Sequence, residues 1–310
     1  IQGNGDLNIA GKTNAGVTFG GTAINYSVRN LNLTGLLTVS TTGNLTVTGT
    51  TSITSTGAFT DNNNAGITAF TGLITHNSTG AWTSTTVTTA SNMVFSAGFT
   101  NTLGTFSAGA ATIGDNQTLT GTVNMSFVNG VTVTGNSDLT IAGTATTGVT
   151  FGGTAINYSV RNLTLTGRLS LTTTGNLTVS GTTSITGAGA FVDNNNAGIT
   201  TFTGAVIHNS TGVWSSTAVT TPANMIFTAG FTNTAGTFNA GGASIGNGQI
   251  LSGAVVLIFN NGLSIGGAGD ITITGAGGVR LAGTAINYTV PGNLTLTGTL
   301  LVSTTGNFTV

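Results

Sequence analysis

The feature that most constrains this chain is a long internal repeat. The segment FGGTAINYSVRNL at 19–31 returns unchanged at 151–163. The two copies are 132 residues apart, and the same distance in sequence separates four further pairs of residues: Asp6 and Asp138, Asp61 and Asp193, His76 and His208, and Trp82 and Trp214. A third copy starts near Gly266 and stops in mid-unit at Val310, so we expect the sequence to be an excerpt of a longer chain. We therefore predict repeat units at 1–132 and 133–264 and a partial unit at 265–310, all within one continuous structure.

A shorter rhythm of about seven residues runs inside each unit. Residues 162–203 divide into the pieces NLTLTGR, LSLTTTG, NLTVSGT, TSITGAG, AFVDNNN and AGITTFT. Apolar and hydroxyl residues alternate within the pieces, which predicts short strands with Leu163 and Leu165 on one face and Thr164 and Thr166 on the other. Gly, Asn and Asp separate the strands because they tolerate positive φ at tight corners.

These strands are too short to be stable as isolated hairpins, but three of them with their corners make a coil of roughly 21–22 residues that can stack on the next one. A unit such as 1–132 then corresponds to six coils, and the whole chain to about 14. Gly, Thr, Asn and Ser dominate, and no segment keeps apolar residues at helical spacing. The sequence therefore predicts an all-β protein, a parallel β-solenoid (β-helix) with a narrow core of Leu, Ile, Val, Phe and Ala.

Composition limits the chemistry that this chain can perform. Charged residues make up 4% of it, against about a quarter in ordinary globular proteins, and it contains no Glu and no Cys. A net charge of −1 provides no basic surface for nucleic acid. The longest apolar run, at 254–259, is far shorter than the roughly 18 residues of a membrane helix, so we expect no transmembrane segment. We predict that the protein is not an enzyme, and that it has no catalytic, cofactor-binding or metal-binding residues and no cofactor.

Two motifs resemble metal or proton-transfer sites and are interpreted structurally. DNNNAG, at 61–66 and 193–198, begins like a calcium loop, but Ala65 occupies a ligand position and no Glu closes the loop. We predict an Asn-rich corner there, with amide hydrogen-bond ladders between coils. His76 and His208 occur once per unit and are predicted to be about 29 Å apart, too far to share a metal or a proton, so we interpret each as a corner residue.

Three further pairs of residues are candidates for binding or catalysis. Asp115 and Asp138 are one coil apart and could stack at the separation of a retaining glycosidase, but the second copy has Asn247 in place of Asp115, which favours a corner role. Arg29 and Arg161 are replaced by Pro291 in the third copy, so we expect them to cover a coil edge or bond corner carbonyls rather than bind an anion. The other pair consists of the tryptophans, which we expect to be packed inside wide coils rather than exposed for sugar stacking: Trp82 and Trp214.

Outward threonines suggest one more activity. Thr46 and Thr48, with similar pairs on neighbouring coils, would form the hydroxyl and methyl lattice of an ice-binding solenoid. Stretches such as TGAFTDNNN and NMVFSAGF interrupt that pattern, so ice binding is a minor alternative.

The runs NLTVTGTTSITSTGAF at 44–59 and NLTLTGTLLVSTTGNFTV at 293–310 resemble the strand repeats of large bacterial surface proteins. These are the filamentous-haemagglutinin-like and autotransporter-like adhesins and the repetitive surface proteins of gliding or sheathed bacteria. The resemblance covers the whole chain and consists of rhythm and composition. It implies secretion, a long stalk or filament, and contact with surfaces or other cells, and it carries over no functional residue.

Together these features predict an extracellular, cell-surface structural protein that self-associates into a fibre, sheath or filament. The open strand edges at Ile1 and Val310 show no capping device, which favours either a longer chain or end-to-end stacking, alongside lateral association of copies. The alternative is the stalk of an adhesin with cell-surface or glycan ligands.

Overall fold

The computed structural model describes residues 4–12, 14–62, 65–195 and 197–310. Its contacts divide the chain into two compact units. Unit 1 contains residues 1–143 and 147–156, and unit 2 contains residues 144–146 and 157–310. The repeat boundaries at 132 and 264 remain a prediction from the sequence.

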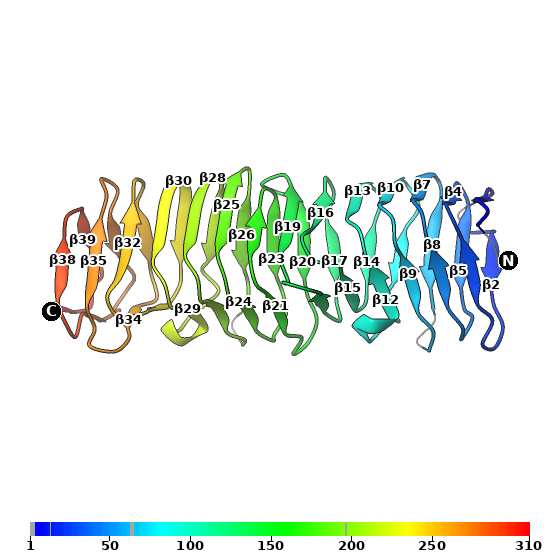
Figure 1. The fold of residues 1–310 in the computed structure, drawn as a ribbon. Coiled ribbons are helices and arrows are strands. Elements are labelled where there is room, and N and C mark those ends of the chain that lie inside the picture. The colour runs from blue at the N-terminus through cyan, green and yellow to red at the C-terminus, as the bar shows by residue number, and fades with distance from the viewer. Residues whose placement is uncertain (1–3, 13, 63–64, 196) are drawn as a thin grey trace. The chain divides into compact units, whose positions relative to one another are not determined.

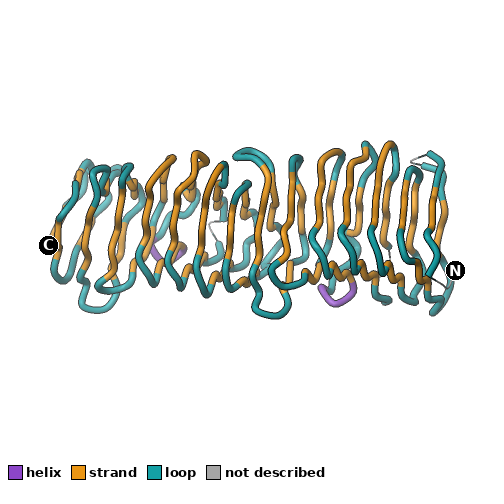
Figure 2. Tube along the Cα trace, turned by 45° about the horizontal axis from the view of Figure 1, so that its top comes forward, coloured by secondary structure: helices purple, strands orange, loops and turns teal. Residues whose placement is uncertain are grey.

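Both units are parallel β-solenoids, and together they contain about 14 turns. A typical turn has three short strands, which define a first, a second and a third face in chain order. Figure 1 shows the strands of successive turns side by side within each unit, and Figure 2 shows the short connections between them. The predicted all-β parallel solenoid is confirmed.

Unit 1 contains the strands β1 to β20 and one short 3-10 helix, η1 (Ala90–Asn92). Its first face consists of β1 (Leu7–Ile9), β4 (Leu31–Leu33), β7 (Thr51–Ser55), β10 (Ile74–Ser78), β13 (Phe99–Leu103), β16 (Gln117–Gly121) and β19 (Leu139–Gly143). Its second face consists of β2 (Val17–Phe19), β5 (Leu36–Val39), β8 (Ala58–Asp61), β11 (Trp82–Ser84), β14 (Phe106–Ala108), β17 (Met125–Phe127) and β20 (Gly148–Phe151). Its third face consists of β3 (Tyr26–Val28), β6 (Leu45–Val47), β9 (Thr68–Phe70), β12 (Met93–Phe95), β15 (Ala111–Ile113) and β18 (Val131–Val133).

Unit 2 repeats this plan with the 3-10 helix η2 (Pro222–Asn224), and two long strands, β28 (Val206–Ser216) and β30 (Phe231–Ala240), run across both the first and the second face. The other first-face strands are β22 (Leu163–Leu165), β25 (Thr183–Gly187), β32 (Gln249–Gly253), β35 (Ile271–Thr274) and β38 (Leu294–Leu296). The other second-face strands are β23 (Arg168–Leu171), β26 (Ala190–Asp193), β33 (Leu257–Phe259), β36 (Val279–Leu281) and β39 (Leu300–Val302). The third face consists of β21 (Tyr158–Val160), β24 (Leu177–Val179), β27 (Thr200–Phe202), β29 (Met225–Phe227), β31 (Ala243–Ile245) and β34 (Leu263–Ile265), and a separate pair is formed by β37 (Tyr288–Thr289) and β40 (Phe308–Thr309).

Turn length varies in the same way in both units. In unit 1, Leu31 is aligned with Thr51, Thr51 with Ile74 and Ile74 with Phe99, so the sequence separation per turn is 20, then 23, then 25. The corresponding residues of unit 2 are aligned with the same three separations: Leu163, Thr183, Val206 and Phe231. The overall spacing of 22 residues agrees with the predicted coil. The longest of these turns, which we call the long turns, run from β10 to β13 and from β28 to β30, and they contain η1 and η2.

Alternation along the strands separates core from surface as the sequence predicts. Each of the six pieces at 162–203 contains one strand. Leu163 and Leu165 are buried, whereas Thr164 and Thr166 are partly exposed. Because strands this short present only one or two inward side chains each, the core of each unit is a single column of stacked apolar residues.

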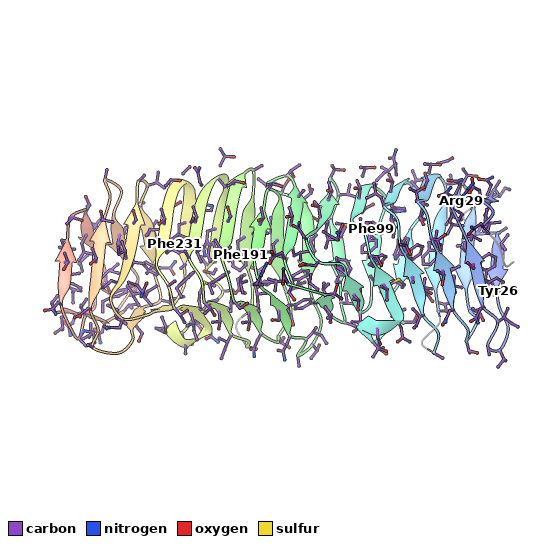
Figure 3. The ribbon with its side chains drawn as sticks, viewed as in Figure 1. Tyr26, Arg29, Phe99, Phe191 and Phe231 are labelled. Carbon is purple, nitrogen blue, oxygen red and sulfur yellow. The ribbon has the colours of Figure 1, made fainter. Side chains whose placement is uncertain are left out.

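The recurring GTAINY motif forms a corner rather than a longer strand. Gly21 and Ala23 have φ of 107° and 55°, and the equivalent Ala155 and Ala285 have φ of 57°. The hydroxyl of Tyr26, which is labelled in Figure 3, donates to the Gly20 carbonyl at 2.8 Å and closes the corner. In the sequence, Ile24, Tyr26 and Val28 alternate with Asn25 and Ser27, which predicts one strand with Ile24 on its buried face. This is wrong: β3 starts at Tyr26, and Ile24 is 47% exposed because it still belongs to the turn.

Candidate functional site

Asp115 and Asp138 lie on adjacent turns of unit 1, as their spacing predicts. The Asp138 backbone N–H donates to Asp115 Oδ1 at 2.9 Å, and the Asn116 N–H donates to the Asp138 carbonyl at 2.9 Å. In unit 2 the Asp270 N–H donates to Asn247 Oδ1 at 2.8 Å in the same way. An amide thus replaces the carboxylate in the same contact, which is the corner role inferred from the sequence.

Asn side chains form the same kind of link at another corner. Asn25 Oδ1 accepts from the Asn44 N–H at 2.8 Å, and Asn44 Oδ1 accepts from the Ile67 N–H at 2.9 Å. Asn157 and Asn176 repeat this ladder in unit 2, each accepting at 2.8 Å. Each side chain satisfies a backbone N–H of the next turn that would otherwise be unpaired where the strand ends.

The described residues of the DNNNAG motif of unit 2 are joined by hydrogen bonds, and position 196 lies outside the described residues. Asp193 is 1% exposed, and its two oxygens accept from the Asn195 N–H at 2.8 Å and from the Thr200 hydroxyl at 2.7 Å. Asn195 in turn donates to the Gly175 carbonyl at 2.7 Å. Burial raises the pKa of Asp193, and this favours the neutral carboxyl.

In unit 1 the same motif starts at the buried Asp61, and positions 63 and 64 lie outside the described residues. Within the described ranges, no three His, Cys, Asp or Glu side chains come together closely enough to hold a metal ion.

His76 and His208 are not corner residues, and this prediction is wrong. They lie inside β10 and β28, and both are 0% exposed. Nδ1 of each ring is 2.8 Å from the side-chain amide of an asparagine on the next turn, Asn101 and Asn233 respectively. Burial lowers the pKa of both histidines, because a charged imidazolium is poorly solvated there. The sequence rhythm missed these pairs because the two partners are separated by a long turn rather than by one coil of average length.

Arg29, which is labelled in Figure 3, forms an exposed ion pair at a corner of unit 1. Its Nε is 2.8 Å from Asp6 Oδ1 on the preceding turn, and the two side chains are 56% and 40% exposed. The carboxylate raises the pKa of Arg29, and the guanidinium lowers the pKa of Asp6. Arg29 thus contacts a carboxylate at the corner rather than the corner carbonyls that the sequence predicts as its partners. The equivalent position of the third copy is Pro291.

Trp82 and Trp214 pack inside their turns, as the sequence predicts. Both are 0% exposed, and each indole is surrounded by phenylalanine rings. Phe191 and Phe231 (labelled in Figure 3) have ring centroids 4.4 and 5.3 Å from that of Trp214. The indole N–H groups donate to Oγ of the serine two positions further on, at 3.3 Å in unit 1 and 3.4 Å in unit 2. Neither indole is available to stack on a sugar.

The threonine lattice considered around Thr46 and Thr48 is interrupted. Thr46 is aligned with Ser27 on one side and with Ala69 on the other. Val94 follows Ala69 in the same row. This part of the third face therefore presents no continuous hydroxyl row.

An unbroken hydroxyl row lies instead on the second face of unit 1. Seven aligned residues form it, and we call it the hydroxyl column: Thr18, Thr38, Thr60, Thr83, Ser107, Ser126 and Thr150. None of the seven hydroxyls hydrogen-bonds to another described residue. Successive members are unequally spaced in the sequence, so a fixed period does not detect the column.

The equivalent row of unit 2 is mixed and contains Ser170, Val192, Ser215, Asn239, Ile258, Arg280 and Leu301. No cavity is found around the residues that the structure describes. The helices among the described residues are short 3-10 helices, and none of them is long enough to cross a membrane. The hydroxyl column is therefore the most regular outward feature available for binding.

Three comparisons test whether this fold and these residues are shared with known proteins. No protein-family model matches the chain. Neither a curated protein nor a solved structure matches it.

Proposed function

We propose that this protein is a non-enzymatic extracellular structural protein whose solenoid repeats build a fibre, sheath or filament at the cell surface. The observation that supports this most is the recurrence of the same series of three turn lengths in both units. A solenoid whose turn lengths repeat can be extended by further copies without a new core, because each turn packs mainly on its neighbours.

Comparison of the two copies shows which positions a fibre would need to keep. Inward residues are retained at equivalent positions, such as Phe59 with Phe191 and Trp82 with Trp214. From Thr38 to Ser126, the outward residues of the hydroxyl column differ between the copies, as in the exchange of Ser126 for Ile258. A scaffold needs its core residues to repeat, whereas a binding site would need its outward residues to repeat.

Self-association is the partner interaction that we propose. A net charge of −1 over 310 residues gives little electrostatic repulsion between copies. Parallel strands also present unpaired N–H and C=O groups wherever a stack has an open edge, and such edges recruit further strands. A stalk that carries an adhesin tip would use the same scaffold and remains the alternative function.

Electron microscopy of native material tests this proposal, with sedimentation of the purified chain over a concentration series. Ordered end-to-end or lateral polymers, growing with concentration, are the expected result. Isolated thin stalks that stay unassociated at every concentration would favour the adhesin alternative. Globular particles would contradict both functions.

The hydroxyl column favours ice binding as a second candidate function. Its hydroxyl and methyl groups repeat along unit 1 at the strand spacing of about 4.8 Å, and no charge interrupts them. We expect the purified chain to inhibit ice recrystallisation if this function holds, and the double substitution Thr83→Lys and Ser107→Lys to abolish the effect. The matched control is Ser215→Lys with Asn239→Lys, the equivalent positions of unit 2. Absence of thermal hysteresis and of recrystallisation inhibition in the unsubstituted chain would eliminate ice binding.

A further inference from the structure

The two buried histidines occupy equivalent and unusual places in their units. His76 on β10 is aligned with Asn101 on β13, and the next aligned pair is Asn77 with Leu103. Thr102 of β13 therefore has no aligned residue on β10 and forms a bulge. In unit 2, His208 on β28 is aligned with Asn233 on β30, and the next aligned pair is Asn209 with Ala235. Each histidine therefore lies at a β-bulge, where the ladder between two turns is already interrupted.

Close packing leaves the His208 ring little room to move, and the backbone is packed in the same way in unit 1. Gly236 follows the bulge with a φ of +71°, and a Cβ there would be 2.2 Å from the Ser210 carbonyl oxygen and 3.2 Å from His208 Cε1. Gly104 in unit 1 has a φ of +74°, and a Cβ added there would likewise be 2.2 Å from the Ser78 carbonyl oxygen. A protonated ring must therefore either stay in the same buried site or leave it, which requires the turn to open.

Hydrogen bonding around the His208 ring suits a neutral imidazole. With its amide nitrogen facing the ring, Asn233 donates to His208 Nδ1 at 2.8 Å and to the Ala235 carbonyl at 2.7 Å. Nδ1 is then an acceptor, so the proton of the neutral ring is on Nε2. Within the described structure, Nε2 of His208 has no hydrogen-bond partner.

A second proton would break this arrangement. Protonated Nδ1 becomes a donor and faces the donor N–H of Asn233, so the amide must rotate and give up its bond to the Ala235 carbonyl. The imidazolium would also be fully buried, which is costly without a paired charge.

No carboxylate on the adjoining strands can compensate that charge. The strands that pair with the histidine ends of β10 and β28, namely β7, β13, β25 and β30, contain no ionisable side chain. The third-face strands β9, β12, β27 and β29 contain none either. The ionisable residues of the preceding turns are the buried Asp61 and Asp193, at the ends of β8 and β26 on the second face.

We propose that each buried His–Asn pair is an acid-sensitive latch that holds its turn closed at neutral pH and lets that turn open locally when the histidine is protonated. One latch occurs in each copy of the long repeat, at the bulge of the long turn. A chain of many copies would thus loosen at regular intervals on acidification while the other turns stay closed.

The direction of the pH dependence follows from linkage. Burial lowers the pKa of both histidines in the folded chain, so the open form binds the proton more tightly. The closed turn is therefore fully favoured above the ordinary histidine pKa of about 6.5 and loses stability as the pH falls below it.

Hydrogen exchange of the intact chain at about pH 7.5 and about pH 5 tests this proposal, because it reports local opening turn by turn. After correction for intrinsic exchange rates, we expect protection at 74–84 and 206–216 to fall about tenfold or more at the lower pH. Strands without histidine, such as β6 and β24, should change little. An even loss of protection over all turns would overturn the proposal.

The repeat provides an internal control in the variant His208→Gln. Glutamine can accept the Asn233 hydrogen bond but does not titrate. The acid effect should disappear at 206–216 and persist at 74–84 of the same molecule, and its persistence at both places would overturn the proposal.

If the variant does not fold, nitrogen-15 NMR of the histidine rings in the unsubstituted chain decides instead. We expect the Nε2–H tautomer at His208 and a pKa below the ordinary histidine value at both rings. A histidine that titrates normally while its turn stays closed would contradict the latch.

Discussion

Replacing Trp214 by alanine is expected to lower the free energy of unfolding of unit 2 by about 3–5 kcal/mol. The indole is 0% exposed, and five phenylalanine rings have centroids within 5.8 Å of its own: Phe191, Phe202, Phe227, Phe231 and Phe238. These rings come from several turns and are held by parallel ladders at fixed spacing, so they cannot collapse into the vacated volume. The free energy of unfolding therefore falls by two contributions: the buried apolar surface of the indole is lost, and a cavity remains in its place.

Denaturant unfolding followed by circular dichroism measures this loss, and hydrogen exchange locates it. Protection should fall mainly in the turns that contribute the five rings, because a solenoid turn is stabilised by its immediate neighbours. The matched control is Val213→Ala: Val213 is the preceding residue, 40% exposed, and Ala81 occupies its place in unit 1. We expect this change to stay within about 0.5 kcal/mol. A Trp214→Ala variant as stable as the control would show that the aromatic cluster does not hold unit 2 together.

Much of the fold could be predicted from the sequence because the strands and turns of a solenoid recur at regular spacings along the chain. Each strand needs inward apolar residues in alternation, so pieces such as NLTLTGR at 162–168 reveal both the strand and its buried face. The long repeat, divided by the coil length, then sets the number of turns. Where alternation continued past the strand, as at Ile24, the prediction failed because turn residues with positive φ also allow an apolar side chain to point outward.

The histidine pairs and the hydroxyl column could not be predicted, for a common physical reason. Both depend on which residues of neighbouring turns are aligned, and the alignment follows turn lengths that are unequal. An extra residue in a bulge or corner shifts the register without changing the local alternation. His208 and Asn233 therefore look like two unrelated polar residues in sequence, although their side chains meet at 2.8 Å.

The corners show why such variation in turn length is tolerated. Asn and Asp side chains accept backbone N–H groups of the next turn, as Asn176 does for Ile199 at 2.8 Å. These bonds join turns of different length without demanding a fixed number of corner residues. The variable corners and the constant core together make the chain extendable, which is the property that a fibre or a stalk requires.

Replacing Gly241 by alanine is expected to destabilise unit 2 by about 3 kcal/mol, from a single added methyl group. A Cβ at Gly241 would be 1.7 Å from the Val219 carbonyl oxygen and 2.9 Å from that of Ser216. Both obstacles are backbone atoms of the long turn that contains η2, so no side-chain rotation can relieve the clash. A Cβ at the equivalent Gly109 of unit 1 would be 1.8 Å from the Val87 carbonyl oxygen, so Gly109→Ala should have a similar effect.

Gly266→Ala is the matched control, because its Cβ would have only ordinary contacts, at 3.6 and 3.9 Å, and its φ is not in the left-handed region. At such a site alanine restricts the unfolded chain, so we expect the free energy of unfolding to rise by about 0.5 kcal/mol. The two glycine substitutions should thus have opposite signs in the same denaturation experiment. If the Gly241→Ala variant were as stable as the Gly266→Ala variant, the backbone of the long turn that contains η2 would not be packed closely against residue 241.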